Sequence, residues 1–311
     1  MDNILFVPSV AESEWVRDVL PGISPAELPV AGKRFVDYAF ERAQKLDVRF
    51  TEVLDGHFSN ELADDFSDLT RTGYPVFYLD AQRRGQTLNG LDDLDLIHTP
   101  LTQPVMDGLW VVWGLCLTSH LTPAFHLRPV PAADCARTPT GIYRRESGHW
   151  MQALPHGMVV KNVEGWYRLN LAVLRNKGSF TLPGYTSEAE VHLGRNVVLE
   201  HGTEVKPPAL LQDNTWCARN VTLDKDVIIG QGSYVGEGAY LSRTIVCDNT
   251  YVGERLDLRN KIVAGRRIID VETGAWADMD EPGMARGIGS NRTGWWRKVL
   301  DFLYGKSWGK R

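Results

Sequence analysis

Residues 191–241 read VHLGRNVVLEHGTEVKPPALLQDNTWCARNVTLDKDVIIGQGSYVGEGAYL, and a six-residue period runs through this stretch without a break. One set of positions six apart, which we call the bulky row, carries mostly large apolar side chains: Leu193, Leu199, Val205, Leu211, Cys217, Leu223, Ile229, Val235 and Leu241. A second set, the small row, stands two residues earlier each time and carries small or β-branched side chains: Val191, Val197, Thr203, Ala209, Thr215, Val221, Val227, Ser233 and Ala239.

This pattern predicts a chain wound into a triangular prism, with a short strand on each face and a tight turn at each corner. The bulky row fills the interior. Glycines follow it at Gly194, Gly230 and Gly236, near corners whose backbone conformations other residues resist. Nine consecutive matches make chance spacing in a β-sandwich a poor explanation. We therefore expect a left-handed parallel β-helix of roughly four coils between about residues 190 and 270.

The region before the repeat alternates strand-like and helix-like patterns. Residues 3–8, 76–79 and 109–113 are short apolar stretches that are typical of buried strands. Residues 32–46 and 164–175 carry apolar side chains at helical spacing. Strands that alternate with helices predict an α/β layered domain with a mostly parallel sheet.

The chain is therefore expected to have three parts: an α/β domain over 1–181, the β-helix over 182–270, and a linker with a basic amphipathic tail over 271–311. From residue 286 to the end there are seven basic residues and one acidic residue, a net charge of +6 that leaves −11 for the rest of a chain with net charge −5. Within 293–311, Trp295, Trp296 and Leu303 share a helical face. Such a segment is suited to docking on an acidic membrane surface or a partner protein, and equally to packing on the chain's own acidic body.

Composition excludes several classes of protein. Hydrophobic residues make up 43% and charged residues 23% of the 311 residues, which is ordinary for a globular protein and unlike a disordered, collagen-like or coiled-coil chain. The negative net charge argues against nucleic-acid binding. Four cysteines without a Cys-x-x-Cys pair favour thiols over disulfides, and with no signal peptide visible we expect a cytoplasmic protein.

Several segments carry more specific strings. LPVAGK at 28–33 is followed by FVDY at 35–38 and ER at 41–42, YRLN stands at 167–170, and LPGY at 182–185. TIVCDNTYVGE at 244–254 is followed by Leu258 and by NKIV at 260–263. Together these segments resemble the sugar-nucleotide pyrophosphorylases, which are sugar-1-phosphate nucleotidyltransferases. The resemblance covers about residues 3–270 and is strongest over 182–270. It implies a Rossmann-like nucleotidyltransferase domain followed by the β-helix, and a role in sugar-nucleotide or polysaccharide metabolism.

The resemblance also implies a chemistry that this sequence does not support. In the family, a G-x-G-[TS]-R-L loop after the first strand holds the triphosphate, a lysine balances charge, and two aspartates hold Mg²⁺. Here the loop is PSVAESE at 8–14, without glycine and with Glu12 and Glu14. Proline stands at the lysine position (Pro25), Leu115 at the first aspartate, and Lys161 or Asn162 at the second.

We therefore expect a nucleotidyltransferase-like protein that has lost catalysis and has a binding, regulatory or assembly role, with no catalytic residue, metal ligand or cofactor assigned. One alternative is an active sugar-1-phosphate nucleotidyltransferase with an atypical site, which would need Mg²⁺. Another is a β-helix acyltransferase, for which His192 or His201 would be the base, although both are expected at corners of the prism.

One loop resembles the part of the family that contacts the base. Residues 82–91, QRRGQTLNGL, offer Arg83, Arg84, Gly85, Thr87 and Asn89 as candidate nucleotide- or sugar-binding residues, the alternative being a solvated turn. The expected partners are a nucleotide or sugar-nucleotide ligand and a second copy of the chain. A homo-oligomer is expected because β-helix ends and flat faces leave apolar edges that need covering.

Overall fold

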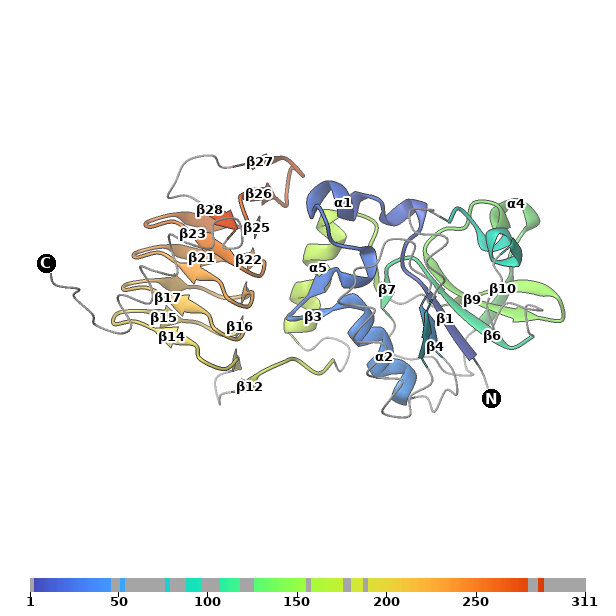
Figure 1. Cartoon of the computed structure of the whole chain (residues 1–311), viewed down its shortest axis with the longest axis horizontal. Helices are drawn as coiled ribbons and strands as arrows, with labels where there is room; N and C mark the ends of the chain where they lie inside the picture. Colours follow the sequence, from blue (N-terminus) through green and yellow to red (C-terminus); the bar gives the residue numbers. More distant parts are fainter. Residues whose placement is uncertain are drawn as a thin grey trace, which may run out of the picture. The chain divides into compact units, whose positions relative to one another are not determined.

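A computed structural model describes residues 3–45, 51–53, 76–78, 88–96, 107–117, 126–154, 158–175, 180–186, 190–278 and 285–287. The chain divides into two compact units, Met1–Leu182 and Pro183–Arg311, which are taken separately below. Figure 1 labels their elements along the chain.

The first unit contains a seven-stranded sheet in the order β5-β4-β1-β6-β9-β10-β8. Its strands are β1 (Asn3–Val7), β4 (Thr51–Val53), β5 (Val76–Tyr78), β6 (Leu109–Trp113), β8 (His126–Pro129), β9 (Gly141–Glu146) and β10 (His149–Leu154). The four strands β5, β4, β1 and β6 are parallel, whereas β9, β10 and β8 are antiparallel. The sheet is therefore mixed, and the expectation of a mostly parallel sheet is corrected.

A tight hairpin accounts for part of this difference. Ser147 and Gly148 join β9 to β10 with φ values of 47° and 78°, the positive values that a two-residue hairpin turn requires. Such a turn forces the two strands to run antiparallel. The sequence Glu-Ser-Gly-His at 146–149 indicates this turn, because Gly148 readily adopts a positive φ.

The helices in the described part of the first unit are short. They are α1 (Trp15–Val19), α2 (Phe35–Lys45), α4 (Ala132–Cys135) and α5 (Val163–Leu174), with 3₁₀ turns at Ala11–Ser13, Pro25–Glu27 and Leu91–Leu96. Two further strand pairs are antiparallel: β2 (Pro29–Val30) with β3 (Lys33–Arg34), and β7 (Cys116–Leu117) with β11 (Met158–Val159). The two predicted helices are confirmed, and α5 begins where the Asn162 side chain accepts a hydrogen bond from Gly165 N–H.

Both faces of the sheet are covered by apolar side chains. Along β1, Ile4 and Phe6 enter one core cluster, which also holds Val36 and Ala39 of α2. Leu5 and Val7 enter the opposite cluster, with Leu91 and Leu94. The unbroken apolar run of β1 follows from this position, because a strand buried on both faces has no reason to alternate with polar residues.

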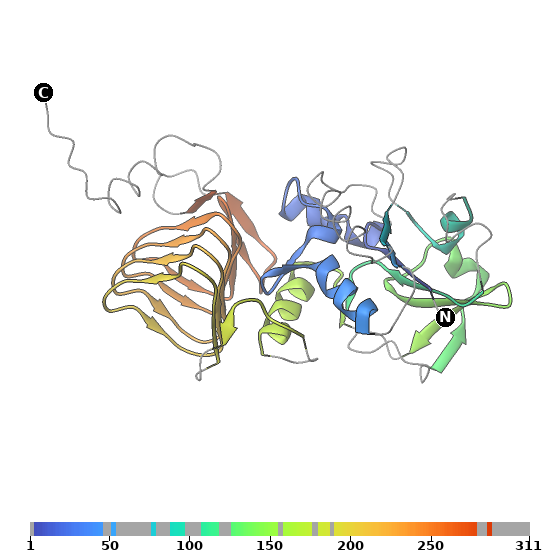
Figure 2. The same ribbon diagram turned by 60° about the horizontal axis from the view of Figure 1, so that its bottom comes forward.

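The second unit is a parallel β-solenoid of about four coils over residues 191–263. Figure 2 shows the coils stacked on one another, with short strands on each face. Its three sheets are built from β13 (Val191–Leu193), β14 (Val198–Leu199), β15 (Glu204–Val205), β16 (Ala209–Leu211), β17 (Trp216–Cys217), β18 (Thr222–Leu223), β19 (Val227–Ile229), β20 (Tyr234–Val235), β21 (Tyr240–Ser242), β22 (Ile245–Val246), β23 (Thr250–Val252), β24 (Asp257–Arg259) and β25 (Lys261–Ala264). β12 (Tyr185–Thr186) precedes the coils and pairs antiparallel with β13.

The interior of the β-helix confirms the six-residue pattern. Bulky-row residues from Leu211 to Leu241 are fully buried, and the small-row residues beside them are at most 1% exposed. Hydroxyls of the small row satisfy backbone carbonyls at the corners: Thr215 donates to Gln212 O and Ser233 donates to Cys247 O. Thr and Ser are therefore tolerated at buried positions of the small row, because their hydroxyls are hydrogen-bonded.

The period changes by one residue after Leu241. Early coils repeat every 18 residues, as Ala209 opposite Val227 shows, but Ile228 lies opposite Ile245, only 17 residues on. A strict six-residue step from Leu241 would place Cys247 in the interior. The inward residue is instead Val246, because the corner that contains Arg243 is one residue shorter than the earlier corners.

The segment after Asp270 is not only a linker. β25 turns back into β26 (Arg267–Asp270), β27 (Trp276–Asp278) pairs with β26, and β28 (Ala285–Gly287) pairs antiparallel with β23. Residues of the second unit beyond Gly287, including the predicted tail at 293–311, lie outside the described residues.

All four cysteines are described and none forms a disulfide. Within the described ranges, no helix combines the length and apolar character that crossing a bilayer requires.

Replacing Leu223 by Ala should destabilise the β-helix by about 2–5 kcal/mol, because the fully buried side chain leaves a cavity in the stacked interior. Thr222→Ala is the matched control, since its side chain lies on the outside of the same strand and its loss should change the free energy of unfolding by less than about 0.5 kcal/mol. Urea unfolding followed by circular dichroism measures both. Equal effects of the two substitutions would contradict the inward placement of the bulky row.

Candidate functional site

Four segments meet at the carboxyl ends of β1 and β6. Val7 lies opposite Trp113, which lies opposite Gly141 at the start of β9, so the ends of these strands are in register. Gly114 N–H donates to Val7 O at 2.8 Å, and Val160 N–H donates to Leu115 O at 2.8 Å. The loop after β1, the turn after β6, the entry to β9 and the residues before α5 therefore form one site.

A glutamate is held at the centre of this site. The Glu12 carboxylate accepts a hydrogen bond from Thr140 N–H at 2.7 Å and forms an ion pair with Lys161 Nζ at 3.1 Å. Partial burial raises the pKa of Glu12, but hydrogen bonds from Thr140 and the ammonium of Lys161 outweigh burial and hold the pKa below its ordinary value of 4.5. The carboxylate is thus an anion bound by the protein's own donors.

Gly114 makes the close approach of Thr140 possible. Its φ is +72°, and a Cβ at this position would lie 2.4 Å from Thr140 Oγ1. A side chain here would push Thr140 away and, with it, the N–H group that binds Glu12.

Backbone donors of the loop after β1 are already in use. Val10 N–H donates to Ser13 Oγ at 2.9 Å, Ala11 N–H to Leu88 O at 3.2 Å, and Ser13 N–H to Val10 O at 2.9 Å. The buried Ser13 hydroxyl also lies 2.8 Å from Pro8 O and so ties the loop to itself. A loop folded in this way has few N–H groups left for a phosphate.

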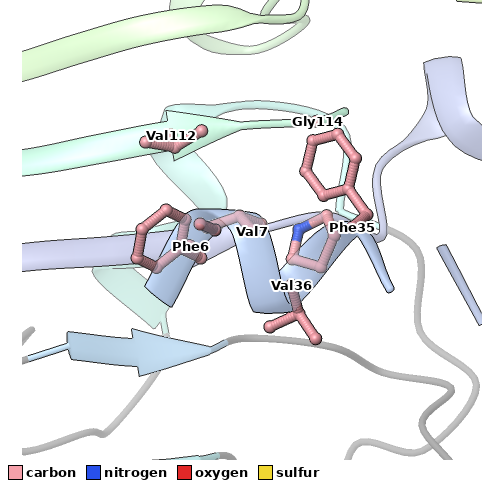
Figure 3. Close-up of a pocket in the computed structure, with 8 residues that line it drawn as sticks. Phe6, Val7, Phe35, Val36, Val112 and Gly114 are labelled. Atoms are coloured by element: carbon pink, nitrogen blue, oxygen red, sulfur yellow. The ribbon is translucent and has the colours of Figure 1, made fainter. Parts of the chain in front are cut away.

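Next to the loop lies a small pocket whose walls are apolar (Figure 3). It encloses about 220 Å³, part of which is its open mouth, and its labelled walls are Phe6, Val7, Phe35, Val36, Val112 and Gly114. Ligand sites usually contain a few polar groups that fix the orientation of the ligand. None of the side chains that line this pocket is polar, so the pocket offers no side-chain partner to a phosphate or a base.

The structure places part of the expected base-binding loop beside the same site. Leu88 forms a β-bridge with Val10, and the exposed Asn89 follows it. Asn89 is held through its backbone, since its N–H donates to Asp93 and its carbonyl accepts from Thr138 N–H. The other candidates, Arg83, Arg84, Gly85 and Thr87, lie outside the described residues.

The positions that the resemblance pairs with charged residues of the family are occupied here by residues with other roles. Pro25 is buried at the start of a 3₁₀ turn, and Leu115 is fully buried. Lys161 is paired with Glu12, and Asn162 is the N-cap of α5. Among the described residues, no three His, Cys, Asp or Glu side chains gather as metal ligands.

Two of the resembling strings contact each other. Asn170, from YRLN, is 1% exposed; its Oδ1 accepts from Ala31 N–H in LPVAGK at 2.7 Å, and its Nδ2 donates to Trp166 O at 2.9 Å. Trp166 Nε1 donates to Pro29 O at 2.6 Å. These residues clamp the β2–β3 hairpin to α5, so the structure gives both strings a packing role. Sequence reasoning did not pair them, because 139 positions separate Asn170 from Ala31.

The two histidines of the β-helix belong to the second unit. His201 is exposed in a corner turn, as expected, but His192 lies within β13 rather than at a corner. Burial lowers the pKa of His192, and Glu190 partly opposes this effect. Sequence reasoning missed Thr140 as a partner of Glu12, because 128 positions separate them and short-range patterns carry no sign of such a contact. It also missed the contacts of Ser13 within its own loop, although these span only three to five positions.

Comparison of the chain with protein-family models and with curated proteins finds no match.

Glu12→Gln should lower stability at pH 7 by about 1 kcal/mol, because a neutral amide loses the ion pair with Lys161. The pKa of Glu12 is lower in the folded chain, so its stabilisation is fully present above the unfolded-state pKa and is lost as the pH falls through the folded-state value. The gap between wild type and variant in urea unfolding should therefore shrink as the pH falls below 4.5.

Glu14→Gln provides the control, since Glu14 is exposed and its side chain makes no capping hydrogen bond to α1. Its substitution should leave the unfolding curves unchanged at both pH values. If the difference in unfolding free energy between wild type and Glu12→Gln is the same at pH 7 and at about pH 4, the ionised carboxylate does not have this role.

Proposed function

We propose that this chain is a sugar-1-phosphate nucleotidyltransferase-like protein of sugar-nucleotide or polysaccharide metabolism that does not catalyse nucleotidyl transfer. Its role is binding, regulatory or structural, as one subunit of an assembly. The observation that carries the proposal is the Glu12 carboxylate, held by Thr140 N–H and Lys161 where the family binds the triphosphate.

Topology supports the family relation. The chain passes from β1 outward to β4 and β5, and then returns to β6 on the other side of β1. In open α/β sheets, ligands bind outside the carboxyl ends of the strands at such a change of direction. Glu12 follows β1 at this edge. A Rossmann-like layer and a left-handed winding of the coils are both part of the proposal, together with the resembling strings.

The chemistry of the site supports the loss of catalysis. Attack of a sugar phosphate on the α-phosphate of a triphosphate needs donors for the phosphates and a metal ion to stabilise charge. The donors of the loop after β1 are used within the protein, and Glu12 would repel an incoming phosphate. Buried Leu115 supplies no ligand, and Lys161 is a cation, so these residues do not fit Mg²⁺.

The proposal includes binding of a ligand that the chain does not convert. The loop around Arg83, Arg84 and Asn89 would contact a base or a phosphate without the residues that hold the metal. The proposed ligands are therefore a nucleotide or a sugar nucleotide. Cytoplasmic location and docking of the segment 293–311 on a membrane or on a partner protein belong to the same proposal.

A pyrophosphate-release assay with Mg²⁺, over a panel of nucleoside triphosphates and sugar-1-phosphates, should give no turnover above the blank. Losing one positioned charge-stabilising group typically costs on the order of 10²–10³ in rate, and here several are missing. Turnover near one per second with any pair would instead identify an active enzyme with an atypical site.

Thermal shift with the same ligands tests the binding role separately, because a ligand that binds the folded state raises the melting temperature. The double variant Arg83→Ala and Arg84→Ala should lose any shift, whereas Arg195→Ala, an exposed arginine of the β-helix, should keep it. If no ligand raises the melting temperature of the wild-type chain, the binding role is excluded and the assembly role is the part of the proposal that remains.

A further inference from the structure

Two successive arginines of the β9–β10 hairpin each cover a tryptophan ring. Arg144 lies opposite Trp110 of β6, and its guanidinium lies 5.0 Å from the centre of that ring. Arg145 lies opposite Trp150 of β10, with its guanidinium 4.9 Å from the ring centre. Because successive side chains of a strand point to opposite faces, the two pairs lie on the two faces of the sheet, and the two tryptophans accordingly belong to different core clusters.

The two guanidinium groups differ in their counter-charges. Arg144 forms an ion pair with Glu146 at 3.2 Å. Among the described residues, no carboxylate forms an ion pair with Arg145, although this side chain is half-buried. Asp107, just before β6, accepts a hydrogen bond from Gly148 N–H at 3.0 Å instead. A cation that is partly removed from water without a counter-charge is unfavourable, so Arg145 is suited to binding an anion.

Two N–H groups of the second pair also have no acceptor. Arg145 Nε and Trp150 Nε1 are shielded from solvent, and neither forms a hydrogen bond within the part of the chain that the structure describes. Trp150 is 4% exposed, so its indole N–H lies inside the protein. Most buried donors in proteins are hydrogen-bonded, and an unpaired one is unfavourable. One positive charge and two unpaired donors in the same place indicate a site for an oxyanion.

The pair lies close to the surface of the hairpin. Only the next cross-strand pair, Glu146 with His149, separates it from the exposed turn at Ser147 and Gly148. A small ligand can therefore reach the guanidinium from the end of the hairpin. A guanidinium binds the oxygens of a phosphate or a carboxylate in pairs, through its planar fork of N–H groups.

A second arginine is placed on the same face. Arg128 of β8 lies opposite Gln152, which is two residues from Trp150 on β10 and therefore points to the same side. Gln152 Nε2 donates to Tyr143 OH at 3.3 Å, and Tyr143 and Trp150 belong to one core cluster. Arg128 is exposed and adds positive potential near the pair, in a chain whose net charge is −5.

We propose that Arg145 and Trp150 bind an oxyanion, which is the phosphate or carboxylate group of a small ligand. The Arg145 guanidinium turns from the ring towards the anion and binds two oxygens through Nε–H and a terminal N–H, while Trp150 Nε1–H donates to the same group. β9 begins with Gly141 at the candidate functional site, whereas Arg145 lies near its other end. The two sites are therefore separate, and binding here does not require the ligand of the proposed function.

Thermal shift of the full chain with sodium phosphate and with sodium malonate, both at millimolar concentration, tests the site. Each melting temperature is compared with that in sodium chloride of the same ionic strength, which removes the general effect of salt. At least one of the two oxyanions should raise the melting temperature above the chloride value, because it binds the folded chain. A shift with phosphate alone identifies a phosphate group, and a shift with malonate alone identifies a carboxylate.

Two variants and one matched control locate the anion. Arg145→Gln should raise the dissociation constant at least about 10-fold, because the anion loses a charged, two-pronged partner. Trp150→Phe keeps a ring beneath the guanidinium but removes the N–H group, and should raise the constant about 2–10-fold. Arg144→Gln, the control, changes the neighbouring arginine on the other face, which also covers a tryptophan, and should bind the anion as the wild-type chain does.

Circular dichroism should show that all three variants fold, since Arg145 lies at the end of a hairpin and Trp150→Phe keeps an aromatic ring. A wild-type chain that shows no shift beyond chloride with either oxyanion would overturn the proposal. So would a shift that persists unchanged in both Arg145→Gln and Trp150→Phe, because the anion would then lie elsewhere. Equal loss of affinity in Arg144→Gln and Arg145→Gln would overturn it as well, since the binding would depend only on the overall charge.

Discussion

The β-helix depends on one geometric constraint, which is that the chain must return over itself after three six-residue steps. Each inward side chain then stacks on its equivalent one coil away, and the backbone of each coil is satisfied by its neighbours. The same register stacks outward side chains: the Tyr234 and Tyr251 rings lie 5.2 Å apart, and Asp224 accepts hydrogen bonds from Tyr240 and Ser242. The pKa of Asp224 is lowered because these bonds and Lys206 outweigh the effect of burial.

At the edge of the first unit's sheet, the governing interaction is competition for donors. A loop after a parallel strand can offer its N–H groups to a phosphate only if the protein leaves them unused. Here Ser13 and Leu88 take N–H groups of that loop, while Glu12 takes Thr140 N–H and the Lys161 ammonium. The two charges at the centre of the site, Glu12 and Lys161, stabilise each other. The same contacts are the basis of our proposal that the site does not bind a triphosphate.

The two ends of the β-helix face the same physical problem and meet it differently. Any coil that ends a stack leaves apolar side chains and strand edges without neighbours. At the far end the chain supplies its own cover through β26 and β28. At the near end, only one sheet gains a covering strand within the described residues, which is β12, and Leu199 is 41% exposed. The two ends of the same stack therefore differ in how far their apolar side chains are buried.

The sequence by itself determined the β-helix, because a six-residue period is a local property that each coil repeats and the bulky row from Leu211 to Leu241 is buried as expected. It also determined β1, α2 and α5, whose apolar patterns are continuous along the chain. Only the tertiary structure decided that β9 of the β9–β10 hairpin pairs with β6, and that Leu199 is exposed. Only it paired Glu12 with Lys161, 149 residues away. The physical reason is that periodicity reports which side of an element is buried, whereas a carboxylate's partner and a coil's missing neighbour depend on distant segments that no local pattern records.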